Sequence, residues 1–195
     1  MQTGVEARPA LSLKRGRQIA QSALSPDGRL VAYTAANKVH VANTSTGEEL
    51  FPPLPTASGY GLVFTPDGRM LVTVDASVTW WDAATGRPFA TGDSNTTRGG
   101  PISLSSDGRL LVKGHSPWVS AYRLDPESRD VRIVLDNTNL AFGGTRAYTV
   151  SPDGQFAVVS QMFSADLRLY EMAKGTRVKG NSTEHAASVS AIAFH

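Results

Sequence analysis

The sequence predicts an all-β fold in which one unit of four antiparallel strands is repeated along the chain. A turn motif, Ser/Thr-Pro/Ser-Asp-Gly, occurs four times, and its glycines (Gly28, Gly68, Gly108 and Gly154) stand 40, 40 and 46 residues apart. Short runs rich in β-branched and aromatic residues flank the motifs, as is typical of strands. No stretch shows the apolar period of a helix. Chance motifs would not keep so regular a spacing, so one structural unit is repeated.

The motif has the chemistry of a tight turn. Its four copies cover residues 25–28, 65–68, 105–108 and 151–154, and three of them contain proline. Proline presets φ at the first corner, the aspartate can accept hydrogen bonds from nearby amides, and glycine adopts the positive φ that closes the turn. Each copy therefore predicts a hairpin between the first two strands of a unit.

The other strands follow in the same order in every unit. The first unit has apolar runs at residues 19–24 and 30–34 on the two sides of its turn. Third strands are expected at residues 38–42, 77–81, 119–124 and 167–172. Polar turns separate them from fourth strands at residues 49–54, 87–91, 130–135 and 177–180. Four strands in about 40 residues make each unit a small antiparallel sheet.

In period and strand number the chain resembles the WD-repeat family, whose members fold as β-propellers of four-stranded blades. The signature dipeptide stands intact as Trp81-Asp82, and the matching positions hold Ala42-Asn43, Tyr122-Arg123 and Tyr170-Glu171. The resemblance implies that Trp81, Tyr122 and Tyr170 are buried between blades. The family's Gly-His pair survives only as Glu184-His185, so most repeats lack the parts of the family's His–Asp–Trp hydrogen-bond network.

The resemblance implies one propeller segment over residues 1–195. Its blades are expected at about residues 16–55, 56–95, 96–140 and 141–183, with residues 184–195 starting a further blade. About four blades plus a partial fifth predict an open arc or an incomplete ring, since closed rings have four to eight blades. An open arc would expose apolar faces and unpaired strand edges on its terminal blades, which favours self-association.

The charge balance and the absence of cysteine exclude several kinds of partner and binding site. There are 19 Lys and Arg against 17 Asp and Glu, and no cysteine. A net charge of +2 builds no strong field toward nucleic acid or anionic lipid. The absence of cysteine excludes disulfides and thiolate metal sites, and the four scattered histidines lack metal-ligand spacing. We therefore expect no metal, no cofactor, no nucleic-acid partner and no membrane partner. The first 20 residues lack the apolar run of a signal peptide, so a cytoplasmic location is expected.

Function is expected where the repeats differ, because the scaffold does not require a longer loop. From Tyr122 to Gly154 is 32 residues, against 27 from Trp81 to Gly108, which predicts an insertion around residues 136–146. The segment after Gly154 is also longer, extending the loop around residues 161–166. In the family that the chain resembles, both kinds of connection emerge on the face that usually docks partners.

Six residues of these connections are the candidate partner-binding site. They are Trp118, Phe142, Phe163, His115, Arg98 and Arg146. Large aromatic and guanidinium groups of this kind dominate the energetics of protein interfaces. In an alternative interpretation, some of the aromatic side chains fold inward and cover loop backbone.

The sequence thus predicts a non-catalytic WD-repeat scaffold that binds a protein or peptide, as part of a larger regulatory protein. One alternative is a propeller that accompanies a hydrolase or peptidase, and another is a truncated remnant without independent function. The nearest approach to a serine nucleophile motif, residues 114–118, lacks the final glycine of Gly-x-Ser-x-Gly. We therefore expect no catalytic residues, while the partner and the biological process stay open.

Overall fold

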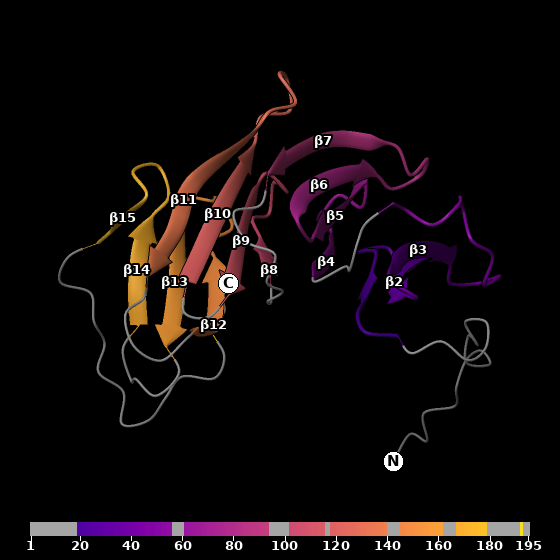
Figure 1. Ribbon diagram of the computed structural model, residues 1–195, viewed down its shortest axis with the longest axis horizontal. Helices are drawn as coiled ribbons and strands as arrows, with labels where there is room; N and C mark the ends of the chain where they lie inside the picture. The colour runs from indigo at the N-terminus through magenta and orange to yellow at the C-terminus, as the bar shows by residue number, and fades with distance from the viewer. Residues whose placement is uncertain are drawn as a thin grey trace, which may run out of the picture.

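The protein is all-β in its computed structural model, which describes residues 19–55, 61–93, 102–115, 118–139, 145–161, 167–178 and 192 (Figure 1). Four antiparallel sheets follow one another in chain order and lie along an arc. The predicted architecture of consecutive propeller blades is therefore confirmed. The described residues contain no helix long and apolar enough to cross a membrane.

Every sheet is a simple meander in which sequential strands are neighbours. Blade 1 contains β1 (Ser22–Leu24), β2 (Leu30–Ala35) and β3 (Lys38–Asn43). Blade 2 contains β4 (Gly61–Phe64), β5 (Met70–Val74), β6 (Ser77–Asp82) and β7 (Pro88–Asp93). Blade 3 contains β8 (Ile102–Leu104), β9 (Leu110–His115), β10 (Trp118–Leu124) and β11 (Val131–Asn139). Blade 4 contains β12 (Thr145–Val150), β13 (Phe156–Gln161), β14 (Leu167–Glu171) and β15 (Thr176–Arg177).

The predicted fourth strand of blade 1, residues 49–54, was wrong as a continuous strand. Only two isolated bridges join this segment to β3, one between Ala42 and Glu49 and one between Val39 and Leu54. The reason lies in Pro52 and Pro53, which have no N–H to donate to a sheet ladder. Leu54 still donates its backbone N–H to the carbonyl of Val39 at 2.8 Å, so the segment follows the edge without forming a strand.

The predicted loop at residues 136–146 was also partly wrong. Its first four residues extend β11, which runs to Asn139 and pairs there with Trp118. Since β10 already begins at Trp118, it provides a partner for these additional residues, and the pairing has register shifts around Ala121. Of the second predicted loop, residues 162–166 lie outside the described residues, as does the start of a fifth blade except residue 192.

The four turn motifs share one hydrogen-bonded design. In the first, the Ser25 hydroxyl donates to Asp27 Oδ1 at 2.7 Å, the Arg29 N–H donates to the same oxygen at 3.0 Å, and the Leu30 N–H donates to Ser25 Oγ at 2.9 Å. The same three bonds recur around Asp67, Asp107 and Asp153. The glycines of the four turns have φ between 66° and 71°. The turn chemistry predicted from the sequence is thereby confirmed.

The strand register makes the four positions matched to the WD dipeptide structurally equivalent. Each lies opposite the third residue after a turn glycine, in the pairs Ala42–Val31, Trp81–Leu71, Tyr122–Leu111 and Tyr170–Ala157. The three aromatic members are buried, as the resemblance implied. In blade 2 the Trp81 indole N–H also donates to Thr73 Oγ1 at 2.8 Å.

The core consists of apolar layers between successive blades. Alternate residues of a strand point to opposite neighbours. In blade 2, Leu71 and Trp81 pack toward blade 1, whereas Val72 and Trp80 pack toward blade 3. A third layer joins blades 3 and 4. Since a fully buried side chain of this size contributes about 1.5–3 kcal/mol, these layers supply most of the attraction between blades.

Besides the apolar layers, hydrogen bonds to the turn motifs also join successive blades. The Trp80 indole N–H of blade 2 donates to the Gly108 carbonyl in the turn of blade 3, at 3.1 Å. In the same way Arg123 Nη2 of blade 3 donates to the Gly154 carbonyl in the turn of blade 4, at 3.2 Å. The Ser106 N–H also donates to the Pro152 carbonyl at 3.1 Å. The motifs therefore close individual hairpins and also fix each blade against the next.

Candidate functional site

The antiparallel meanders place the connections between strands on two opposite faces. We call the end that carries residues 25–28, 65–68, 105–108 and 151–154 the turn face; the β6–β7 and β10–β11 connections lie there too. The opposite end, with the β2–β3, β5–β6, β9–β10 and β13–β14 connections, we call the hairpin face. Of the six predicted partner-binding residues, His115, Trp118 and Arg146 lie at the hairpin-face ends of β9, β10 and β12.

The backbone brings three of these six residues to one region of the hairpin face. His115 ends β9 and pairs directly with Trp118, which begins β10. Arg146 lies near the start of β12 in the next blade. A Cβ added at Gly114 would overlap the ring of Tyr148, so β9 and β12 approach each other closely beside these residues. The other three candidates, Arg98, Phe142 and Phe163, lie outside the described residues.

Two buried residues of opposite charge, Lys113 and Asp75, interact electrostatically between blades 2 and 3, and sequence analysis missed them. Lys113 in β9 is 0% exposed and faces blade 2. Burial lowers the pKa of its ammonium group to about 8, although the Asp75 carboxylate opposes this shift. Asp75 follows β5 and accepts hydrogen bonds from the N–H and hydroxyl of Ser77. A lysine inside the apolar strand Leu110–His115 was the signal in the sequence.

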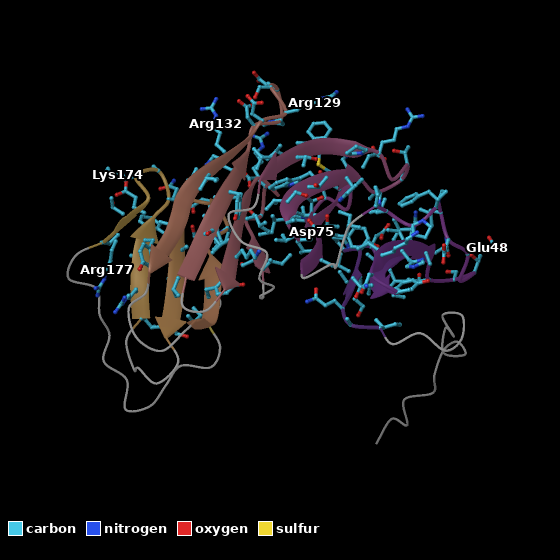
Figure 2. The ribbon with its side chains drawn as sticks, in the orientation of Figure 1. Glu48, Asp75, Arg129, Arg132, Lys174 and Arg177 are labelled. Carbon is cyan, nitrogen blue, oxygen red and sulfur yellow. The ribbon has the colours of Figure 1, made fainter. Side chains whose placement is uncertain are left out.

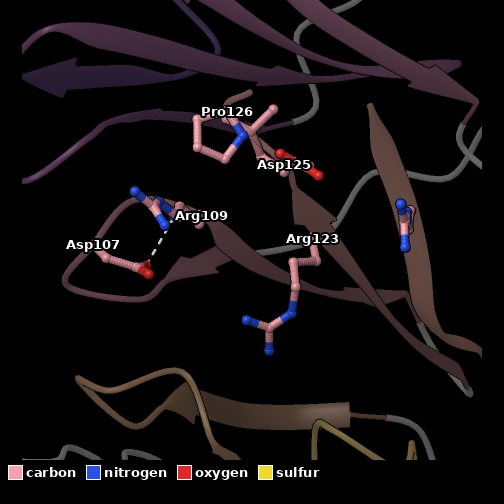
Figure 3. A pocket seen from close by; sticks show the side chains of 7 residues that line it. Asp107, Arg109, Arg123, Asp125 and Pro126 are labelled. Carbon is pink, nitrogen blue, oxygen red and sulfur yellow. Dashed lines mark hydrogen bonds between the residues drawn. The ribbon is translucent and has the colours of Figure 1, made fainter. Parts of the chain in front are cut away.

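On the turn face, a hollow of about 270 Å³ lies at the base of the β10–β11 hairpin (Figure 3). It is lined by Asp107, Arg109, Arg123, Leu124, Asp125, Pro126 and Arg132. An adjoining hollow of about 140 Å³ shares four of these residues and extends over blade 2 to Thr65, Asp67 and Met70. The two hollows form one groove across the joint between blades 2 and 3, which we call the joint groove.

The carboxylates of the larger hollow are already engaged in their own turns. Asp107 accepts hydrogen bonds from Ser105 and from the Arg109 N–H. Asp125 accepts from the Glu127 N–H at 2.9 Å and the Ser128 N–H at 3.3 Å, and these bonds lower the pKa of Asp125. The guanidinium groups of Arg109 and Arg132 form no ion pair with any residue that the structure describes. Three guanidinium groups thus face two carboxylates in this hollow, and Arg132 acts electrostatically on Asp125.

The β10–β11 turn departs from its counterparts in the other blades. Four residues after the aspartate, asparagine or glutamate that starts each turn, those blades have glycine with positive φ: Gly47, Gly86 and Gly175. Blade 3 has Arg129 at this position, with φ 60°. The Arg129 guanidinium lies 4.9 Å from the ring centre of Phe89 in blade 2. In Figure 2 Arg129 and Arg132 lie on the hairpin that projects beyond the sheets.

Sequence analysis did not find the joint groove, because its lining comes from the turn at residues 65–68 of blade 2 and from two turns of blade 3 that lie 40 or more residues further along the chain. One local signal was present: the β10–β11 turn, residues 125–130, is the one polar turn of the four without glycine. No group of three or more His, Asp or Glu side chains in the described ranges is arranged to hold a metal ion.

Blade 1 has a mixed outer face, on the side away from blade 2. Tyr33 and His40 stack with ring centres 5.1 Å apart, and both side chains contact Glu49, His40 Nδ1 at 3.1 Å. Leu24 lies on the same face and is 61% exposed. The face therefore combines a polar cluster with an exposed apolar side chain, and self-association through it stays a prediction.

Comparisons with known proteins agree with this architecture. No family model matches the chain. In an alignment 101 positions long, which covers 47% of this chain and 8% of the relative, it is 34% identical to apoptotic protease-activating factor 1 of Homo sapiens. The hydrazine synthase of Kuenenia stuttgartiensis shares the fold with a TM-score of 0.64 at 18% identity, covering 93% of this chain and 52% of that one. The repeated sheets are thus WD-repeat-like β-propeller blades, and the chain spans only part of the length of both proteins.

Proposed function

We propose that these blades form a non-catalytic module that binds a protein or peptide on the hairpin face of blades 3 and 4. The observation that carries this proposal is the backbone pairing of His115 with Trp118, next to the start of the strand that contains Arg146. Tryptophan and arginine are the residue types most enriched at the energetic centres of interfaces.

The joints between the blades support this role physically. A binding surface is most effective when rigid elements hold its residues, because less entropy is lost on association. Here β9 and β12 are held by the contact of Gly114 with Tyr148 and by the core layer between blades 3 and 4. The human relative is by its name a protease-activating factor, and by analogy we propose a regulatory assembly as the setting of this chain.

The test places a photo-crosslinking amino acid at position 118 and, as a matched control, at position 133. Ile133 is an exposed apolar residue of β11, 40% exposed, near the turn end of that strand. We expect a discrete crosslinked partner from position 118 only, and binding of the isolated partner at least tenfold weaker after Trp118→Ala. Equal crosslinking from both positions, or a folded Trp118→Ala variant with unchanged affinity, would contradict the proposal.

A further inference from the structure

We propose that the joint groove on the turn face is a second binding site, for an extended peptide segment that carries an acidic and a basic side chain. The groove lies at the opposite end of the sheets from the docking surface proposed above. The two proposals therefore rest on different residues, and each can fail without the other.

The larger hollow has the chemistry to hold a carboxylate. Arg109, Arg123 and Arg132 line it beside two aspartates, so cationic groups outnumber carboxylates there. Arg123 is fixed by its bond to the Gly154 carbonyl and extends away from Asp125 in Figure 3. A carboxylate between Arg109 and Arg132 would receive charge-assisted hydrogen bonds, which are about twice as strong as neutral ones.

The smaller hollow has the opposite balance of charge. It is lined by Asp67 and Asp107 with Arg109 as its one cationic residue. Burial opposes ionisation of Asp67, but hydrogen bonds from Thr65 and from the Arg69 N–H outweigh it and lower the pKa of Asp67. That carboxylate is therefore ionised at neutral pH and attracts a cation. Because three aspartates line the two hollows, a polyanion such as nucleic acid is a poor fit.

Size and shape also favour a peptide. A volume of about 270 Å³ lies below the roughly 300–1,000 Å³ that is usual for small-molecule sites, and it suits one or two side chains. The adjoining hollows continue across the joint, so a segment could place successive side chains in both. Leu124, 4% exposed, and Pro126 line both hollows and can contact the aliphatic parts of the bound side chains.

The backbone of blade 3 gives a second, independent observation. Arg129 adopts the positive φ that Gly47, Gly86 and Gly175 adopt in the equivalent turns, although a side chain is disfavoured there. Conformations of this kind cluster at functional sites, and in this protein Ala36 and Asn37 of the β2–β3 turn adopt one as well. The turn that departs from the repeat pattern contributes Asp125 and Pro126 to the joint groove, and Arg132 of β11 lines the groove beside them.

Nuclear magnetic resonance of arginine side chains in the full chain tests the proposal. The probe is a capped peptide of seven residues with one Glu and one Lys among glycines and serines. We expect saturable shifts of the Arg109 and Arg132 signals, lost when Gln replaces Glu in the peptide and weakened when Gln replaces Lys. Inorganic phosphate is the competing probe, and saturable phosphate binding without peptide binding would overturn the proposal.

Protein variants provide the matched control. Arg109 and Arg29 are both exposed and both follow the glycine of a turn motif, but only Arg109 lines the groove. We expect Arg109→Gln and Arg132→Gln each to weaken peptide binding at least fivefold, and Arg29→Gln to change it less than twofold. Equal losses in all three variants would show general charge attraction and overturn the site. Unchanged affinity in the folded Arg109→Gln variant would do the same.

Discussion

Blades 2 and 3 are neighbours with the same strand order, yet they differ at three equivalent positions. Blade 2 has Trp81 bonded to Thr73 and closes its outer turn with Gly86. Blade 3 has Tyr122 and Lys113 at the first two positions and Arg129 at the third. Two of the replacing groups interact with the adjacent blade, Lys113 with Asp75 and Arg129 with Phe89, whereas the Tyr122 hydroxyl has no hydrogen-bond partner among the described residues. The comparison teaches that the same strand order accommodates polar groups of both kinds between blades.

The largest expected effect comes from removing the acidic partner of Lys113. In Asp75→Asn the amide can still accept from Ser77, but Lys113 stays buried without its counter-charge. Removing one partner of a buried pair costs about 3–5 kcal/mol, so we expect urea unfolding to show a loss of about 3 kcal/mol. Combining it with Lys113→Met should recover more than half of this loss. No recovery in the double variant would show that Asp75 acts independently of Lys113.

The pH dependence of the free energy of unfolding tests the burial of Lys113 directly. The pKa of Lys113 is lowered to about 8 in the folded state, whereas the unfolded chain holds this proton up to about pH 10.5. Between these values the unfolded state binds more protons, so stability from this group rises with pH. We expect the unfolding free energy of the native chain, relative to Lys113→Met, to increase between pH 8 and pH 10.5 by on the order of 2 kcal/mol. A flat difference would contradict a charged, buried Lys113 at neutral pH.

Smaller changes in the free energy of unfolding are expected at Trp81 and Tyr122, and the two positions should differ. Trp81→Phe removes the bond to Thr73 and part of the packing, and we expect a loss of about 2 kcal/mol. The Tyr122 hydroxyl is buried and has no hydrogen-bond partner among the described residues. Tyr122→Phe should therefore leave the unfolding free energy unchanged or raise it by up to about 1 kcal/mol. Thermal and urea unfolding measure both, and a Tyr122→Phe loss as large as that of Trp81→Phe would remove the distinction.

Much of the fold could be predicted because its determinants are local. The turns around Asp27, Asp67, Asp107 and Asp153 each use residues within five positions, so their spacing revealed the repeat. The two errors had local causes that the repeat pattern concealed. Pro52 and Pro53 interrupt a strand that the other blades have, and the early start of β10 at Trp118 gives an expected loop a strand partner.

The joint groove could not be predicted in the same way, because it depends on distant residues. Asp67 and Arg132 lie in different blades, and only the packing of blade 2 on blade 3 brings their hollows together. Lys113 was visible in the sequence, but its partner Asp75 lies 38 positions away and stands where no other repeat has an aspartate. The positions that recur in every blade could thus be predicted from the sequence. The contacts of the positions that differ between blades could be identified only in the structure.

The bonds from Trp80 to Gly108 and from Arg123 to Gly154 run in one direction, each from a blade to its successor. A perturbed turn glycine therefore deprives the preceding blade of a bonding partner as well as damaging its own hairpin. In a repeat array with such contacts between neighbours, the stability of each blade depends on the blades next to it, so the blades do not unfold independently. Damage to one blade of this protein would accordingly destabilise both of its neighbours, because the apolar layers and hydrogen bonds at each joint belong to the two blades together.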